Sequence, residues 1–110
     1  MTMEKLKLRV TIDRPIGFED SYGNVYPINY GFVSGVIGGD GEEQDVYVIS
    51  KEATSPMNTF EGVLVAVIHR KNDNENKWVV TSEKEVLSEK EIFERTHFLE
   101  KYFDSVIEVL

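Results

Sequence analysis

The sequence predicts a mainly β domain of the α+β class, in which five short strands close into a small barrel and a helix follows at the C-terminus. Short apolar runs, separated by glycine, proline and acidic turns, indicate the strands. A capping signal near the C-terminal end indicates the helix. We expect a closed barrel because closure leaves few exposed strand edges. A chain of 110 residues can bury one core, so residues 1–110 are expected to form a single domain.

The N-terminal half of the chain carries three of the predicted strands. Apolar and polar side chains alternate over residues 6–12, which is the period of a half-buried strand. A loop with proline and glycine follows over residues 13–24. A second stretch, rich in aromatic and β-branched residues, runs over residues 25–37 and ends at a glycine-rich turn at 38–41. Residues 46–49 then form a short apolar strand.

The C-terminal half contains a hairpin and the helix. Residues 62–69 are apolar on both faces and predict a central strand, which should pair with residues 77–80 across the polar loop at 71–76. Ser88 and Glu91 form a capping box that begins the helix. Apolar spacing predicts that this helix continues to the end of the chain, through Ile92, Thr96, Leu99, Phe103, Val106 and Leu110.

The composition narrows the chemistry that a site could use. The absence of cysteine excludes disulfides, thiolate zinc sites and a cysteine nucleophile. Because only two histidines are present, oxygen ligands are the expected choice for any metal. A net charge of −8 disfavours nucleic acid as a partner and suits divalent cations, although the same balance could serve solubility alone.

The sequence also gives expectations about location and assembly. It has no apolar stretch of about 18 residues, the length of a membrane span, and no apolar block of a secretion signal at its start. We therefore expect a cytoplasmic protein with no membrane partner. The apolar residues that a short barrel exposes predict self-association into a homo-oligomer.

Residues 40–45 hold the densest group of polar side chains, with four carboxylates in six positions beside a glycine-rich turn. Carboxylates this close repel one another unless a cation neutralises them. Mg²⁺ needs only one or two protein carboxylates, with water and substrate phosphate as its remaining ligands. A solvated acidic turn is the alternative, and the spacing does not fit a calcium-binding EF-hand.

Two further segments could contact phosphate. Tyr26 and Tyr30 could donate hydrogen bonds to phosphate oxygens without adding charge, or could serve as core aromatics. Lys77 could bind phosphate as a point charge while Asp73 and Glu75 hold a second metal ion. A charged hairpin tip is the alternative for this segment.

The segment YPINYGF at 26–32, followed by DGEEQDVYV at 40–48, resembles the signature of family I inorganic pyrophosphatases in order, spacing and residue chemistry. The resemblance implies an OB-like barrel and hydrolysis of pyrophosphate with Mg²⁺, or alternatively Mn²⁺. It implies that Asp40, Glu42 and Asp45 are metal ligands, with Glu42 also the general base.

The resemblance continues on both sides of this signature. Residues 75–77 resemble the D-x-K motif of the family, which implies Glu75 as a metal ligand, with Asp73 as a further one, and Lys77 as a phosphate ligand. Near the C-terminus, HFLEKYF at 97–103 resembles the family's terminal helix: Tyr102 matches a tyrosine of that motif, and Phe103 replaces a phosphate-binding lysine.

Two alignments of the N-terminal strand remain open. One matches Asp13 to an active-site glutamate, which fits Pro15 and Gly17 and means that a hairpin of the family is missing. The other matches Arg14 to a phosphate-binding arginine. With Tyr30 and Lys77 as further catalytic groups, pyrophosphate hydrolysis is the expected function. The missing groups leave two alternatives: a non-catalytic module that binds metal and phosphate, or a hydrolase of a larger phosphoanhydride such as a nucleotide.

Overall fold

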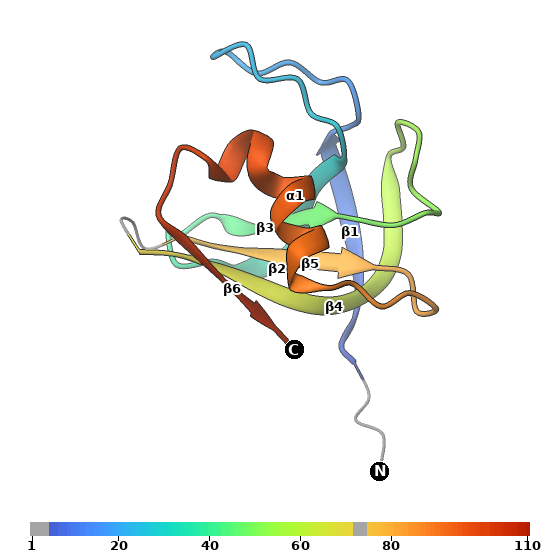
Figure 1. Cartoon of the computed structure of the whole chain (residues 1–110). Helices are drawn as coiled ribbons and strands as arrows, with labels where there is room; N and C mark the ends of the chain where they lie inside the picture. The colour runs from blue at the N-terminus through green and yellow to red at the C-terminus, as the bar shows by residue number, and fades with distance from the viewer. Residues whose placement is uncertain (1–4, 72–74) are drawn as a thin grey trace.

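In the computed structural model, which describes residues 5–71 and 75–110, five strands close into a barrel and one helix packs against it (Figure 1). Neighbouring strands run in the order β1, β2, β3, β5, β4 around the ring, and β4 pairs with β1 to close it. The predicted five-stranded OB-like barrel with a C-terminal helix is confirmed. Its elements are β1 (Lys7–Arg14), β2 (Asn29–Ile37), β3 (Glu43–Val48), β4 (Thr59–Arg70), β5 (Asn76–Thr81), α1 (Glu89–Glu100) and β6 (Ser105–Val109).

The long strand β4 closes the barrel. One edge pairs with β5, which confirms the predicted hairpin. Its other edge is shared: Thr59 to Val63 pair with β1, and Ala66 to Arg70 pair with β6. Figure 1 shows β4 curving along the barrel so that both partners can reach it.

The helix begins as predicted but ends earlier. The Ser88 hydroxyl accepts a hydrogen bond from the backbone N–H of Glu91 at 3.1 Å, as a capping box requires. The prediction of a helix that reaches Leu110 is wrong, because α1 ends at Glu100 and residues 105–109 form β6. The β-branched residues of β6 suit a strand, and half of one β4 edge is available for it. No helix of the described residues is long and apolar enough to span a membrane.

Two details of the β1–β2 pair shape the neighbouring site. A Cβ atom on Gly31 would lie 1.9 Å from the carbonyl oxygen of Thr11, so only glycine permits this approach of the strands. The register shifts between Ile12 and Arg14, where β1 carries an extra residue opposite β2. Such a bulge redirects side chains. Here it places Arg14 opposite Tyr30.

The core lies on both faces of the barrel wall. Tyr47 belongs to a buried cluster that includes Ile92 of α1, whereas its neighbours Val46 and Val48 belong to a second buried cluster with Val10. Alternate residues of one strand therefore point to opposite faces, and both faces are covered. This is why β3 is continuously apolar from residue 46 onward.

Glu85 joins the segment after β5 to the segment after β3. Its carboxylate accepts hydrogen bonds from the Ser82 hydroxyl at 2.6 Å, the Lys51 backbone N–H at 2.8 Å and the Ser50 hydroxyl. Burial alone would raise the pKa of Glu85, but these hydrogen bonds outweigh it and lower the pKa to about 2.

We expect Glu85 to make the fold sensitive to acid. Because its folded-state pKa lies below the ordinary value of 4.5, its contribution to stability is complete above pH 4.5 and is lost as the pH falls toward 2. Urea unfolding of wild type and Glu85→Gln between pH 7 and pH 2 would test this. The wild type should lose more stability over that window than the variant. Glu94→Gln, at an exposed helix position, is the control; parallel pH curves for wild type and Glu85→Gln would contradict the assignment.

A candidate metal and phosphate site

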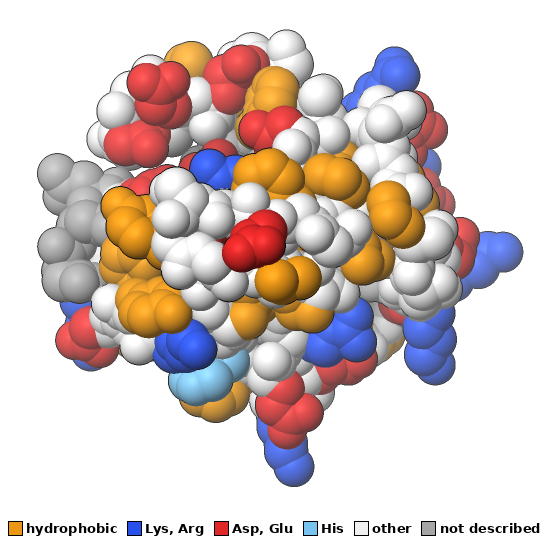
Figure 2. All heavy atoms as spheres, turned by 90° about the horizontal axis from the view of Figure 1, so that it is seen from above, with side chains coloured by type: hydrophobic (Ala, Val, Ile, Leu, Met, Phe, Trp, Pro, Cys, Tyr) orange, Lys and Arg blue, Asp and Glu red, His pale blue; other side chains and the backbone are white. Residues whose placement is uncertain are grey.

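A cleft of about 720 Å³ opens beside the barrel. Its walls come from all five barrel strands, from the β1–β2 loop, from Glu75 just before β5, and from the end of α1 with the segment that follows. In Figure 2 a hollow with basic and acidic side chains at its base lies next to hydrophobic side chains. The cleft therefore joins charged and apolar surfaces.

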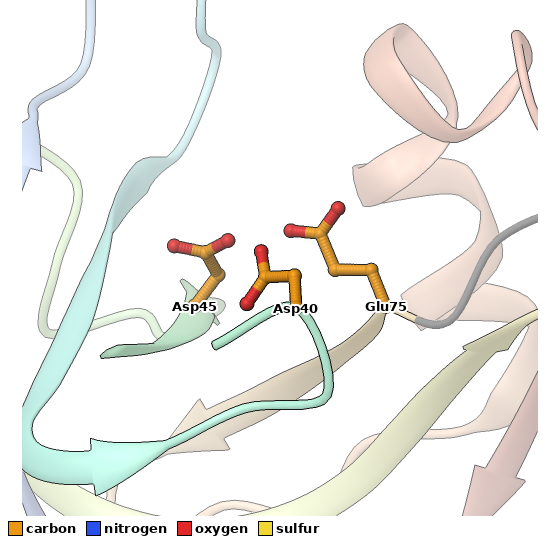
Figure 3. A group of neighbouring side chains, drawn as sticks. All are labelled: Asp40, Asp45 and Glu75. Carbon is orange, nitrogen blue, oxygen red and sulfur yellow. The ribbon is translucent and has the colours of Figure 1, made fainter. Parts of the chain in front are cut away.

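Three carboxylates converge beside the cleft, and two of them, Asp45 and Glu75, line it. Asp40, Asp45 and Glu75 each offer one oxygen, and these oxygens lie within 4.8 Å of one another. Figure 3 shows them converging from the β2–β3 turn, from β3 and from the residue before β5. Asp45 and Glu75 are distant in sequence but near in space because β3 and β5 are parallel neighbours, with Val46 opposite Trp78. The structure thus brings together residues from two predicted acidic segments.

Among the described residues, one predicted metal ligand, Glu42, is not in this group. Glu42 is exposed on the same turn, where its backbone N–H donates to a carboxylate oxygen of Asp40 at 3.0 Å. Glu75, which is also a predicted metal ligand, is the third carboxylate of this group. Asp73 lies outside the residues that the structure describes.

Lys77 and Tyr30, the predicted phosphate ligands, contact each other beside the acidic group. The buried ammonium of Lys77 donates to the Asp45 carboxylate at 2.6 Å, to the Tyr30 hydroxyl at 2.9 Å and to the Glu75 carboxylate. Lys77 thus supplies positive charge between two of the three converging carboxylates, and all of these side chains line the cleft.

The protonation of this group follows from its contacts. Burial opposes ionisation of Asp45, but hydrogen bonds with Glu75 and Lys77 outweigh it and lower the pKa of Asp45. Burial, together with the hydrogen bond to Asp45, raises the pKa of Glu75. Burial and the nearby charge of Asp45 raise the pKa of Tyr30 well above 10. Asp45 therefore stays an ionised carboxylate, and Tyr30 stays a phenol that can donate a hydrogen bond.

The two residues that the alternative N-terminal alignments assign to the site both lie at the cleft. Asp13 and Arg14 line it, and Arg14 donates to the Tyr26 hydroxyl at 2.6 Å. The Arg14 guanidinium also lies 5.5 Å from the ring centroid of Phe18 and 5.7 Å from those of Tyr26 and Tyr30. Among the described residues, Tyr26 is buried behind Arg14 and is not part of the cleft lining. It therefore positions the arginine.

Sequence reasoning missed a buried ion pair behind the cleft. The Arg70 side chain is 4% exposed, and it donates to both oxygens of Glu100, at 3.1 Å from Nε and 2.6 Å from Nη2. The Tyr47 hydroxyl donates to the same carboxylate at 2.5 Å. Burial would raise the pKa of Glu100, but the bonds from Arg70 and Tyr47 outweigh it and lower that pKa. Glu100 is therefore an anion held by Arg70.

The spacing of buried residues along α1 could have predicted this ion pair. Glu100 follows Ile92 and Thr96 at intervals of four, so it falls on the buried face of α1. A carboxylate on that face requires a buried cation. Arg70, at the end of an apolar strand, was the available candidate.

The C-terminal segment contributes Tyr102 and Phe103 to the cleft. Tyr102, a predicted substrate ligand, donates from its hydroxyl to the Asn24 side-chain oxygen at 3.1 Å and so ties this segment to the β1–β2 loop. The Phe103 ring centroid lies 3.6 Å from the guanidinium carbon of Arg70. Arg70 of β4 therefore provides a positive charge on the side of the cleft where Phe103 stands in place of a lysine.

Comparisons with known proteins agree with this architecture. The family model described as inorganic pyrophosphatase matches residues 3–106. An inorganic pyrophosphatase of Aeropyrum pernix is 45% identical over 49 residues, which cover 44% of this chain and only 28% of that protein.

Solved structures extend the likeness over the whole fold. The inorganic pyrophosphatase of Helicobacter pylori superposes with a TM-score of 0.65 at 22% identity and covers 100% of this chain and 88% of that one. That of Ehrlichia chaffeensis gives 0.66 at 16% identity, over 94% of this chain and 85% of the other. At such identities the structures show a shared fold, and the family model adds a sequence match over nearly the full length. By that match the chain belongs to the inorganic pyrophosphatase family.

Proposed function

We propose that this chain hydrolyses inorganic pyrophosphate to two phosphates with Mg²⁺ as its cofactor. The observation that carries the proposal is the convergence of the Asp40, Asp45 and Glu75 carboxylates, of which Asp45 and Glu75 line one cleft together with Lys77. Carboxylates that could hold a metal ion and an ammonium that could hold phosphate are the groups that phosphoryl transfer needs. Membership of the family supports the same reaction.

The donor set fits a hard divalent cation. Asp40, Asp45 and Glu75 offer only carboxylate oxygens, which suit Mg²⁺, with Mn²⁺ as an alternative. Asp45, with its lowered pKa, is available as an anion without first losing a proton. A bound cation would act as a Lewis acid on the phosphoryl oxygens.

The remaining side chains would bind and orient the substrate. Lys77 and Tyr30 already share a hydrogen bond at 2.9 Å, so one phosphate oxygen could accept from both. Arg14 adds a guanidinium at the cleft wall, held by Tyr26. The general base that the resemblance assigns to Glu42 stays a prediction, since its side chain is exposed on the turn that carries Asp40.

The assay is phosphate release from pyrophosphate by the purified chain. We expect release with Mg²⁺ and none after removal of divalent cations with EDTA. Binding of Mg²⁺ and phosphate without release would favour the non-catalytic module, and absence of both binding and release would contradict the proposal. The cytoplasmic location and the homo-oligomer predicted from the sequence stay predictions, as does the exclusion of nucleic acid as a partner.

A further inference from the structure

The cleft has a polar base and an aromatic mouth. Its base carries Asp45, Glu75 and Lys77, the groups suited to metal and phosphate. Its mouth adds apolar surface from Leu99 and Phe103 and the rings of two tyrosines, Tyr22 and Tyr102. Inorganic pyrophosphate has only charged oxygens and cannot use this apolar surface. A volume of about 720 Å³ falls within the range of roughly 300–1,000 Å³ that is typical of pockets for drug-sized organic ligands.

Tyr22 is held in an exposed position by its loop. Tyr22 lines the cleft and is nevertheless 90% exposed to solvent. The Asp20 carboxylate accepts hydrogen bonds from the backbone N–H of Tyr22 at 2.9 Å and of Asn24 at 3.0 Å, and Gly23 takes a positive φ of 84° to complete the turn. The backbone of Tyr22 is therefore fixed. Only the two side-chain torsions of the tyrosine are then left to be ordered by a ligand, so the entropic cost of binding is small.

Tyr102 is the second exposed tyrosine that lines the cleft. It is 59% exposed, and its hydroxyl bonds to Asn24, two residues from Tyr22 in the same turn. The two tyrosines thus come from distant parts of the sequence and are joined through one short turn. Exposed aromatic rings beside a phosphate site are suited to stacking on the base of a nucleotide.

We propose that the cleft takes a nucleoside diphosphate, with its phosphates at the carboxylates and Lys77 and its base stacked against Tyr22 and Tyr102. This inference rests on the proposed function, because the same site would do the chemistry. Water would attack the terminal phosphorus, and the bond from that phosphorus to the bridging oxygen would break. The products are phosphate and a nucleoside monophosphate, which keeps the bridging oxygen, and the proton of the water passes to solvent.

The test uses ADP, tripolyphosphate and pyrophosphate, each with Mg²⁺, on wild type, Tyr22→Ala and Tyr22→Phe. Tripolyphosphate is a polyphosphate without an aromatic group. By calorimetry we expect Tyr22→Ala to weaken ADP binding by about tenfold, the range for loss of one base–aromatic contact, and Tyr22→Phe to retain it. The affinity for tripolyphosphate should change much less. Val86→Ala, at a residue that is 86% exposed and is not among those lining the cleft, controls for loss of a surface side chain.

The outcomes separate this inference from the proposed function. Phosphate release from pyrophosphate, together with ADP binding that is absent or unaffected by Tyr22→Ala, would overturn the nucleotide inference and leave the proposed function intact. No release from pyrophosphate would remove the proposed function, and the dependence of ADP binding on Tyr22 would still decide whether the mouth holds a base. Equal weakening of ADP and tripolyphosphate binding by Tyr22→Ala would also overturn the inference, since no base contact would then be involved.

Discussion

Replacing Asp45 by asparagine is expected to lower kcat for pyrophosphate by at least about 100-fold at saturating Mg²⁺. Asparagine keeps the size of the side chain but removes the charge that the lowered pKa of Asp45 preserves at neutral pH. It removes an anion from the group formed with Asp40 and Glu75 and weakens the contact to Lys77, now at 2.6 Å. Single-turnover and steady-state phosphate release over a range of Mg²⁺ concentrations would measure the loss.

Two other variants sharpen this experiment. Glu61→Gln removes an exposed carboxylate from β4, away from the acidic group, and should leave the rate unchanged. Glu42→Gln tests whether Glu42 takes part in the reaction. A rate near that of wild type would favour a metal group made of Asp40, Asp45 and Glu75. A loss as large as that of Asp45→Asn would show that the Glu42 carboxylate is also needed for hydrolysis. An Asp45→Asn enzyme as fast as wild type would contradict the proposed metal site.

Replacing Glu100 by alanine should cost up to about 3–5 kcal/mol of folding free energy, because buried Arg70 loses its closer carboxylate partner and keeps only Glu75, at 3.4 Å. Arg70 is 4% exposed and loses both hydrogen bonds to the carboxylate, and the Tyr47 hydroxyl loses its acceptor. For a domain of this size we expect the melting temperature to fall by at least about 10 °C. Thermal and urea unfolding followed by circular dichroism would measure both quantities.

A double variant provides the matched control. Arg70→Met with Glu100→Leu replaces the pair by apolar side chains and should recover most of the lost stability, since the penalty arises from a buried guanidinium that has lost its closer partner. A destabilisation by Glu100→Ala of less than about 1 kcal/mol, the value of an ordinary hydrogen bond, would show that the buried Arg70–Glu100 ion pair contributes little to stability.

Local signals in the sequence predicted the barrel strands and much of the site. Alternation placed β1, and the glycine-rich turn placed the start of β3 to within a few residues. The aromatic segment located Tyr30, and the charged segment before β5 located Glu75 and Lys77. These features depend on period, turns and side-chain chemistry, which adjacent residues determine.

The features that depend on distant pairing could not be predicted in this way. The parallel contact of β3 with β5 decides that Glu75 joins Asp45, and no local pattern reports that contact. Similarly, the spacing through Phe103 and Val106 fitted a helix, whereas the β-branched residues of β6 and the available edge of β4 favour a strand. Pairing with β4 decided between these two local preferences.

The shared edge of β4 has a mechanical consequence. Arg70 pairs with Ser105 at the start of β6, and the Ser105 hydroxyl donates to Glu100 at 2.8 Å. Strand β6 therefore covers the Arg70–Glu100 ion pair and helps to keep solvent away from it. Pulling β6 away, by an applied force or by a competing peptide strand, would admit water to Arg70 and loosen the cleft wall formed by Arg70 and Phe103 before the barrel itself opens.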